Sequence, residues 1–208
     1  MKTSQTISSR QAFTMIELVF VIVVLGILSY MVASGFQRNT VVEAADQIVA
    51  NIRYTQHLAM QDDKFQSATN QYYRERWNIR FATDSSGNGN WVYWIMSDRD
   101  RNGTDAKDYA KDPENSNTLL SGDSSLANRN LNFDLTRKYG ITRVTNNCAL
   151  VGGRIFFDYL GRPYNDTVFP ATSVHQNLIT VPCTIVIASG ATTRTIEISP
   201  ETGYVRHF

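Results

Sequence analysis

The chain has 208 residues, of which 42% are hydrophobic, and its 20 basic and 19 acidic side chains leave a formal charge of +1. This length suits one domain of ordinary size, and the composition excludes collagen, a chain disordered throughout and a membrane protein with several spans. A charge so close to neutral gives no global electrostatic reason to expect nucleic acid as the main partner. The hydrophobic residues are unevenly spread, because 15 of the 19 residues at 18–36 are apolar. The chain therefore consists of one apolar segment joined to a polar domain.

This apolar segment is long enough to cross a membrane once. Nineteen helical residues extend about 28 Å, close to the thickness of a hydrocarbon core of about 30 Å. Lys2 and Arg10 precede the segment, and Glu43 and Asp46 follow it. Because basic residues favour the cytoplasmic flank, we expect the N-terminus in the cytoplasm and the rest of the chain outside. A cleaved secretory signal is the alternative, although residues 31–35 offer it only a poor cleavage site.

An acidic residue stands at the entrance of the apolar segment. A carboxylate that enters hydrocarbon costs a few kcal/mol, so Glu17 requires a cationic partner. The stretch from Ala12 to Phe20 reads Ala-Phe-Thr-Met-Ile-Glu-Leu-Val-Phe, and the apolar run continues after it. This pattern resembles the class III signal of type IV pilins and of the pseudopilins of type II secretion systems. The resemblance covers roughly residues 1–60.

The pilin resemblance implies processing at the N-terminus. In that family a membrane peptidase removes a leader and methylates the new amino terminus, while the apolar helix is kept. Residues 1–12 would be the leader, cleavage would fall between Ala12 and Phe13, and Phe13 would be N-methylated. Glu17 would serve assembly, because its carboxylate can pair with the freed Phe13 amine in the same or a neighbouring subunit. The chain departs from the family at Ala12, where Gly is usual.

A helical pattern continues beyond the apolar segment. We predict one helix from about Phe13 to Asp63, with a transmembrane and assembly part at 13–36 and an amphipathic part at 37–63. The amphipathic part is expected to pack on a globular head. Its expected buried face consists of Val41, Ala44, Ala45, Ile48, Ile52, Thr55 and Ala59, and the residues between them are Glu43, Asp46, Gln47, Asn51 and Arg53.

The head, residues 64–208, has the pattern of a β-rich domain. Residues 98–130 are polar and predict a long excursion without regular strands. One helix followed only by strands predicts an α+β fold with an antiparallel sheet, and the resemblance makes this a type IV pilin-like fold. The predicted strands are 77–82, 91–96, 141–144, 154–158, 184–188, 194–199 and 204–207.

Several short motifs in the head occur in a characteristic order. They are Trp-Val-Tyr-Trp at 91–94, Asp98-x-Asp100-x-Asn102-Gly103, Phe156-Phe157-Asp158 followed by Gly161-Arg162-Pro163, and Ile196-Glu197-Ile198 followed by Thr202-Gly203-Tyr204-Val205. Their order resembles the H-type minor pseudopilins of the type II secretion system (GspH/FimT-like). This resemblance implies a structural, non-enzymatic role in protein secretion across the outer membrane, in a single-pass inner-membrane protein with a periplasmic head. The implied partners are other pseudopilins, the prepilin peptidase and methyltransferase, the membrane and a secreted protein substrate.

Two other functions stay open. A minor pilin of a type IV pilus or DNA-uptake system would share the leader and the apolar helix. Some relatives of this kind bind DNA through a basic C-terminal Gly-Arg-x-Arg, but here Tyr204 replaces the first arginine and leaves Arg206. A second basic cluster, Arg74, Arg76 and Arg80, lies beside aromatic residues. An enzyme tethered by an uncleaved anchor is the third class, although no catalytic motif is complete.

A calcium loop is the one cofactor site that the sequence suggests. Hard oxygen ligands recur at alternate positions from Asp98, and Gly103 permits the sharp turn of an EF-hand-type loop. Tyr109 stands where such a loop has its closing Glu, and an Asx-rich turn explains the same residues. The candidate ligands are Asp98, Asp100, Asn102, Thr104 and Asp105.

The chain has two cysteines, Cys148 and Cys183. Outside the cytoplasmic membrane an even pair favours a disulfide, with two buried thiols as the alternative. The three histidines show no metal-type spacing with these cysteines, so zinc is not expected. Asp158 and Arg162 flank a turn, and we expect a local ion pair between them.

Overall fold

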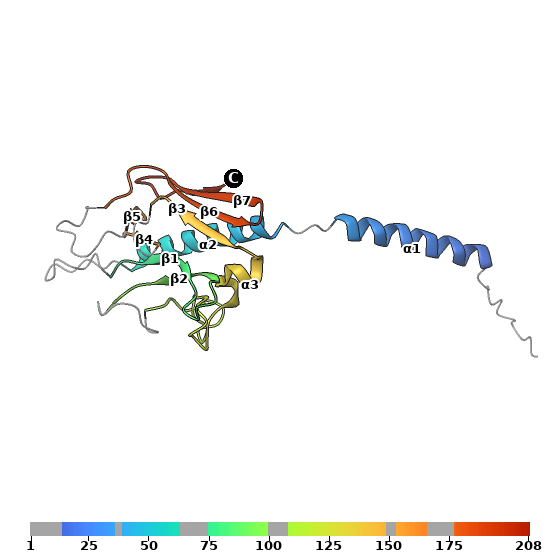
Figure 1. Cartoon of the computed structure of the whole chain (residues 1–208), viewed down its shortest axis with the longest axis horizontal. Helices are drawn as coiled ribbons and strands as arrows, with labels where there is room; N and C mark the ends of the chain where they lie inside the picture. Colours follow the sequence, from blue (N-terminus) through green and yellow to red (C-terminus); the bar gives the residue numbers. More distant parts are fainter. Residues whose placement is uncertain (1–13, 36–38, 63–74, 100–107, 149–152, 166–176) are drawn as a thin grey trace, which may run out of the picture. The chain divides into compact units, whose positions relative to one another are not determined.

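The computed structural model of the chain describes residues 14–35, 39–62, 75–99, 108–148, 153–165 and 177–208. The chain divides into two compact units, residues 1–39 and 40–208. The first unit contains helix α1, and the second contains helix α2, a short helix α3 and two antiparallel sheets (Figure 1). The fold is therefore α+β, as the sequence predicts.

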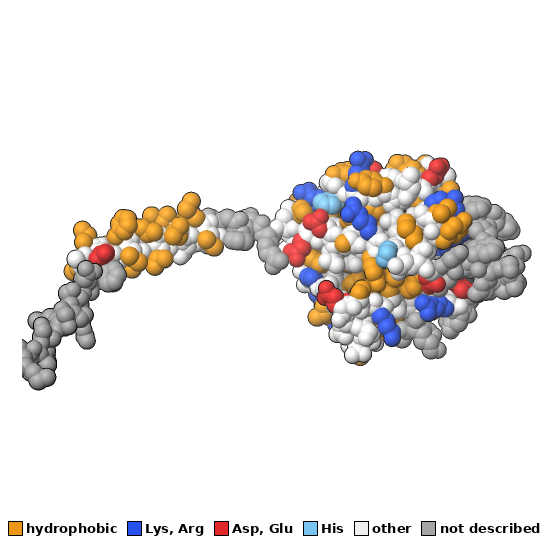
Figure 2. Space-filling view, turned by 180° about the vertical axis from the view of Figure 1, so that it is seen from behind, with side chains coloured by type: hydrophobic (Ala, Val, Ile, Leu, Met, Phe, Trp, Pro, Cys, Tyr) orange, Lys and Arg blue, Asp and Glu red, His pale blue; other side chains and the backbone are white. Residues whose placement is uncertain are grey.

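Helix α1, Met15–Gly35, is apolar on every side. Figure 2 shows orange, hydrophobic side chains along the part of α1 that is drawn in colour. Its stretch Met15–Val32 has a mean hydropathy of 2.6, and none of this stretch is buried by the rest of the chain. Among the described residues, this is the one helix that is long and apolar enough to cross a membrane.

Helix α2, Thr40–Gln61, is separate from α1, because Asn39 between them is not helical. The prediction of one continuous helix from Phe13 to Asp63 is therefore wrong at this point. Glycine and asparagine both disfavour the helix interior, and Gly35 and Asn39 stand at the two sides of the interruption. Apolar residues resume at helical spacing from Val41, directly after the interruption, and this favoured the prediction of one continuous helix.

The strands of the head form two antiparallel sheets of four strands each. In the first sheet the order is β2-β1-β4-β5, with β1 at Asn78–Thr83, β2 at Trp91–Met96, β4 at Arg154–Phe157 and β5 at Pro163–Asn165. In the second sheet the order is β3-β6-β7-β8, with β3 at Arg143–Asn146, β6 at Cys183–Ser189, β7 at Thr192–Ile198 and β8 at Val205–His207.

All seven predicted strands are present, with boundaries that differ from the prediction by at most two residues. Strand β5, which begins at Pro163, was not predicted from the sequence. Helix α3, Leu135–Tyr139, and the 3-10 helix η2, Leu131–Phe133, were not predicted either. Both lie directly after the polar excursion, and α3 has a complete set of caps. Asp134 accepts a hydrogen bond from the Arg137 amide at its start, and Gly140 closes its end with a φ of 71°.

Helix α2 contacts strands of both sheets, β1 and β4 of the first and β6, β7 and β8 of the second. All seven residues predicted for its buried face are buried. Burial on more than one side also explains why Asn51, which was expected outside, is buried and donates a hydrogen bond from Nδ2 to the Tyr93 hydroxyl over 2.7 Å. The core of the head therefore surrounds α2.

The described end of the polar excursion packs along the edge of strand β2. The Ala110 amide donates to the Ile95 carbonyl, and the Ile95 amide donates to the Leu120 carbonyl. A second, smaller hydrophobic cluster forms there from Val92, Trp94, Met96, Tyr109 and Leu119. The excursion thus covers an edge that would otherwise expose unpaired backbone groups.

Candidate functional site

The start of helix α1 has the arrangement of a capping box. The Glu17 amide donates to the Thr14 hydroxyl over 3.3 Å, and the Thr14 amide donates back to Glu17 Oε2 over 3.4 Å. Such a pair satisfies two of the amide groups that the first turn of a helix leaves without partners. The acidic side chain also lies at the positive end of the helix dipole. Glu17 therefore has a local role at the helix start, which was not predicted from the sequence.

The two residues at the expected cleavage position, Ala12 and Phe13, lie outside the described residues. The expected pairing between the Phe13 amine and Glu17 therefore stays a prediction. Thr14 is the first described residue, and it would be the second residue of a chain cut after Ala12.

The candidate calcium loop lies mostly outside the described residues as well. Asp98 is buried at the end of the segment after β2, whereas Asp100, Asn102, Thr104 and Asp105 fall in the stretch that is not described. Within the described part of the chain, no group of three or more His, Cys, Asp or Glu side chains is placed to hold a metal ion. The calcium hypothesis thus stays a prediction.

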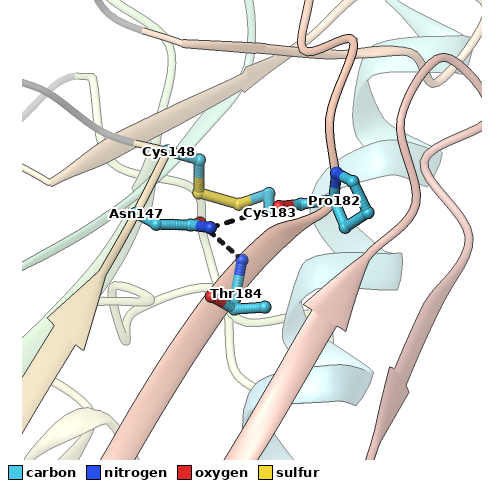
Figure 3. The surroundings of a disulfide bond; sticks show 5 residues. All are labelled: Asn147, Cys148, Pro182, Cys183 and Thr184. Atoms are coloured by element: carbon cyan, nitrogen blue, oxygen red, sulfur yellow. Dashed lines mark hydrogen bonds between the residues drawn. A yellow bond between two sulfur atoms is a disulfide. The ribbon is translucent and has the colours of Figure 1, made fainter.

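The two cysteines form a disulfide, and their Cα atoms lie 5.1 Å apart. The bond joins the segment after β3 to the first residue of β6 (Figure 3). Asn147 supports it, because its Oδ1 accepts the Thr184 amide over 2.7 Å and its Nδ2 donates to the Pro182 carbonyl over 3.3 Å. On the chain-entropy account, closing this 35-residue loop stabilises the head by about 3–4 kcal/mol.

A buried carboxylate, Asp158, organises the turn between β4 and β5. Its side chain is 2% exposed and lies 2.7 Å from Arg162 Nη2, so the expected ion pair is present. Asp158 also accepts hydrogen bonds from the amides of Leu160 and Arg162 and from the Tyr164 hydroxyl. Burial and the Asp158 charge together raise the pKa of Tyr164 to about 12. The hydrogen bond to Asp158 likewise raises the pKa of Arg162.

Gln56 links this turn to the C-terminal turn at 200–203. Its side-chain nitrogen donates to the carbonyl oxygens of Gly161 over 3.2 Å and of Gly203 over 2.7 Å. The two glycines have φ values of 75° and 69°, which other residues rarely adopt. Gln56 was not a predicted site residue, because its position inside a helical run carries no local signal for this role.

The basic residues that suggested nucleic-acid binding are engaged within the head. Arg206 pairs with Glu197 Oε1 at 2.8 Å, and the guanidinium carbons of Arg76 and Arg80 lie over the rings of Tyr164 and Trp94. Arg74 lies outside the described residues. Arg206 is therefore a neutralised cation, which weakens its attraction for phosphate.

The histidines have different surroundings. His207 Nε2 lies 2.9 Å from Asp46 Oδ1, which ties β8 to the first half of α2. His57 is exposed on α2, and His175 lies outside the described residues.

Comparisons with protein-family models, with curated proteins and with solved structures found no match. A functional assignment therefore depends on the N-terminal motif, the two helices and the head.

Proposed function

We propose that this chain is a minor pseudopilin of a type II secretion system, with a structural role in the pseudopilus. The observation that supports it most is the Phe-Thr-x-x-Glu motif at the start of a fully exposed apolar helix, followed by a second helix at the centre of an α+β head. An apolar helix exposed on every side requires lipid or other helices around it. The membrane supplies lipid around α1 before assembly, and a filament supplies neighbouring helices around it afterwards.

In this proposal the chain is made with a leader and inserted once in the inner membrane. The peptidase cuts after Ala12, and the freed, methylated Phe13 amine supplies a cation near Glu17. Moving α1 from lipid into a bundle of neighbouring α1 helices exchanges one apolar surrounding for another, so little hydrophobic free energy is lost. Glu17 and the Phe13 amine then favour the arrangement of neighbouring subunits in which the two charges are paired, because an unpaired charge in that bundle is costly.

A minor pilin of a DNA-uptake system is the alternative function, with the same helix and leader. It receives less support from the head, because Arg206 is paired with Glu197 and the C-terminal segment has no second arginine.

Mass spectrometry of the mature protein tests the proposal. The expected chain begins at N-methylated Phe13 and lacks residues 1–12. A chain that still begins at Met1, or that begins near Ser34, would contradict the pseudopilin function and favour an anchor or a secretory signal.

A pair of variants separates the two roles of Glu17. Glu17→Val is expected to lose its leader normally but to reach the filament fraction at least about tenfold less, because the amine loses its partner. Thr14→Val removes the hydroxyl of the capping box and keeps the carboxylate, so a smaller loss is expected. Equal filament content for Glu17→Val and the unchanged chain would refute the pairing.

A further inference from the structure

The C-terminal segment carries an exposed row of large side chains. Along β8 and its two flanking residues, burial alternates with the strand period, so that Val205 faces the core and Tyr204, Arg206 and Phe208 face outward. Tyr204 is 61% exposed and Phe208 is 63% exposed. The Arg206 guanidinium carbon lies 5.8 Å from the centre of the Phe208 ring. We call Tyr204, Arg206 and Phe208 the C-terminal row.

Two more exposed apolar side chains lie near the Tyr204 end of the C-terminal row. Met60 is 52% exposed at the end of α2, and its methyl group lies against Gly161. Leu160, the neighbour of Gly161 in the turn, is 54% exposed. The Gly161 carbonyl approaches Gly203 so closely that no side chain fits there, which places Tyr204 beside this turn.

The segment that carries the C-terminal row is attached to α2 by hydrogen bonds to its backbone and by the side chain of His207. Gly203 accepts from Gln56, the Val205 carbonyl accepts from Arg53 Nη2 over 2.9 Å, and His207 pairs with Asp46. Phe208 exchanges two backbone hydrogen bonds with Thr195 of β7. A surface held in this way loses little conformational entropy when it binds a partner.

The chemistry of this surface suits a protein partner. Exposed tyrosine, phenylalanine and arginine are the residues that concentrate at the centres of protein interfaces. Glu197 already neutralises Arg206, so the C-terminal row offers no free positive charge to nucleic acid or to an anionic lipid. These five exposed side chains are far fewer than the roughly 20–30 residues per partner, about 800 Å², that a stable complex of free proteins buries.

We propose that the C-terminal row, with Met60 and Leu160, is the surface on which the head of a neighbouring filament subunit docks. The small number of exposed side chains favours this occupant, because subunits already joined through α1 meet at a high effective concentration and need only a weak contact between heads. A freely diffusing partner has no such advantage. The inference rests on the pseudopilin function proposed above.

Site-specific photo-crosslinking of the full-length chain in its own cells tests this inference. A photoreactive phenylalanine derivative replaces Tyr204 or Phe208, and in a matched control it replaces Leu131, which is 59% exposed elsewhere on the head. Crosslinked products are identified by peptide mass spectrometry. At positions 204 and 208 the expected product is an adduct with the head of another subunit that has a processed pilin-type N-terminus, at least fivefold above the Leu131 control.

A second pair of variants measures the same contact without a probe. Tyr204→Ala combined with Phe208→Ala should lower the amount of neighbouring subunit recovered with the filament at least fivefold, whereas Leu131→Ala should not. Both substitutions are at exposed sites, so the thermal midpoint of the head should stay unchanged.

The outcomes distinguish this inference from the proposed function. Adducts with DNA alone, or with secreted protein alone, would overturn the docking inference, as would equal adducts at Leu131. If the chain begins at Phe13 and positions 204 and 208 give no subunit adduct, the docking inference is wrong and the pseudopilin function stands. If the chain still begins at Met1, the proposed function itself fails.

Discussion

At the scale of single residues, Asp84 in the turn between β1 and β2 is a carboxylate that accepts several hydrogen bonds. Its Oδ1 accepts the amide of Ser124 over 2.9 Å and the hydroxyl of Ser124 over 2.8 Å, and its Oδ2 accepts the Ser86 hydroxyl over 2.6 Å. Burial by itself would raise the pKa of Asp84. The hydrogen bonds to the charged carboxylate lower the pKa by more than burial raises it, so the pKa lies well below the usual range. The carboxylate thus joins the β1–β2 turn to Ser124, in the segment that precedes η2.

The depressed pKa of Asp84 predicts how stability responds to acid. A group whose pKa is lower in the folded state stabilises the fold above its unfolded pKa, about 3.9 for Asp, and loses that contribution as the pH falls. Asp84→Asn should therefore lower the free energy of unfolding at pH 7 by about 2 kcal/mol, the range of hydrogen bonds to a charged group. The difference from the unchanged chain should shrink below about pH 4.

Urea unfolding at pH 7 and at pH 3 measures this difference. Ser86→Ala, which removes one donor and keeps the carboxylate, serves as the control with a smaller loss at pH 7. A loss for Asp84→Asn that is the same at both pH values would show that the charge of Asp84 does not contribute.

At the scale of elements, the contact between two turns decides how the C-terminal strand is placed. The turn that precedes β8 ends at Gly203, with a φ of 69°, and a β-carbon there would overlap the Gly161 carbonyl oxygen. Gly87, in the β1–β2 turn, has a similar φ of 77° but open space around it. Gly87 is therefore required only for its positive φ. Gly203 is required both for its positive φ and because a side chain there would overlap Gly161.

Alanine substitutions at these glycines should differ in their cost. Gly87→Ala is expected to lose about 1–2 kcal/mol, the cost of the left-handed conformation alone. Gly203→Ala adds the overlap with Gly161 and the loss of the Gln56 contact, so a total of about 2–5 kcal/mol is expected. Thermal unfolding of both variants measures the difference, and equal losses would show that the two turns can separate at little cost.

At the scale of the whole molecule, the head contains its own hydrophobic core. The core surrounds α2 and includes residues of both sheets, from Ile79 and Ile155 in the first to Ile187 and Ile196 in the second. No side chain of α1 belongs to the core clusters of the described residues. The disulfide also lies within the head.

A fragment of residues 40–208 should therefore fold without α1. Its thermal midpoint is expected within a few degrees of that of the full-length chain in detergent, because the same apolar contacts are made in both. Reduction of the disulfide should lower the stability of both by about 3–4 kcal/mol. Circular dichroism with and without reductant measures these values, and a fragment that is unfolded under oxidising conditions would show that the head depends on α1.

Local patterns in the sequence were sufficient to predict many elements of the head. The seven strands follow from alternation and turn residues, and the buried face of α2 follows from its 3.6-residue period, because each signal lies within a few neighbouring positions. The apolar run at 18–36 likewise predicts a helix able to cross a membrane. The Asp158–Arg162 pair was predictable for the same reason, since only four positions separate the two residues.

By itself, then, the sequence determined the kinds of elements, their approximate boundaries and the N-terminal motif on which the proposed function rests. Only the tertiary structure decided that the strands form two sheets around α2, that Asn51 is buried against Tyr93 and that Gln56 joins two distant turns. These contacts link residues between 42 and 147 positions apart, as with Asn51 to Tyr93 and Gln56 to Gly203. Such contacts depend on how whole helices and strands pack, and a local sequence pattern does not indicate which of their surfaces will be in contact.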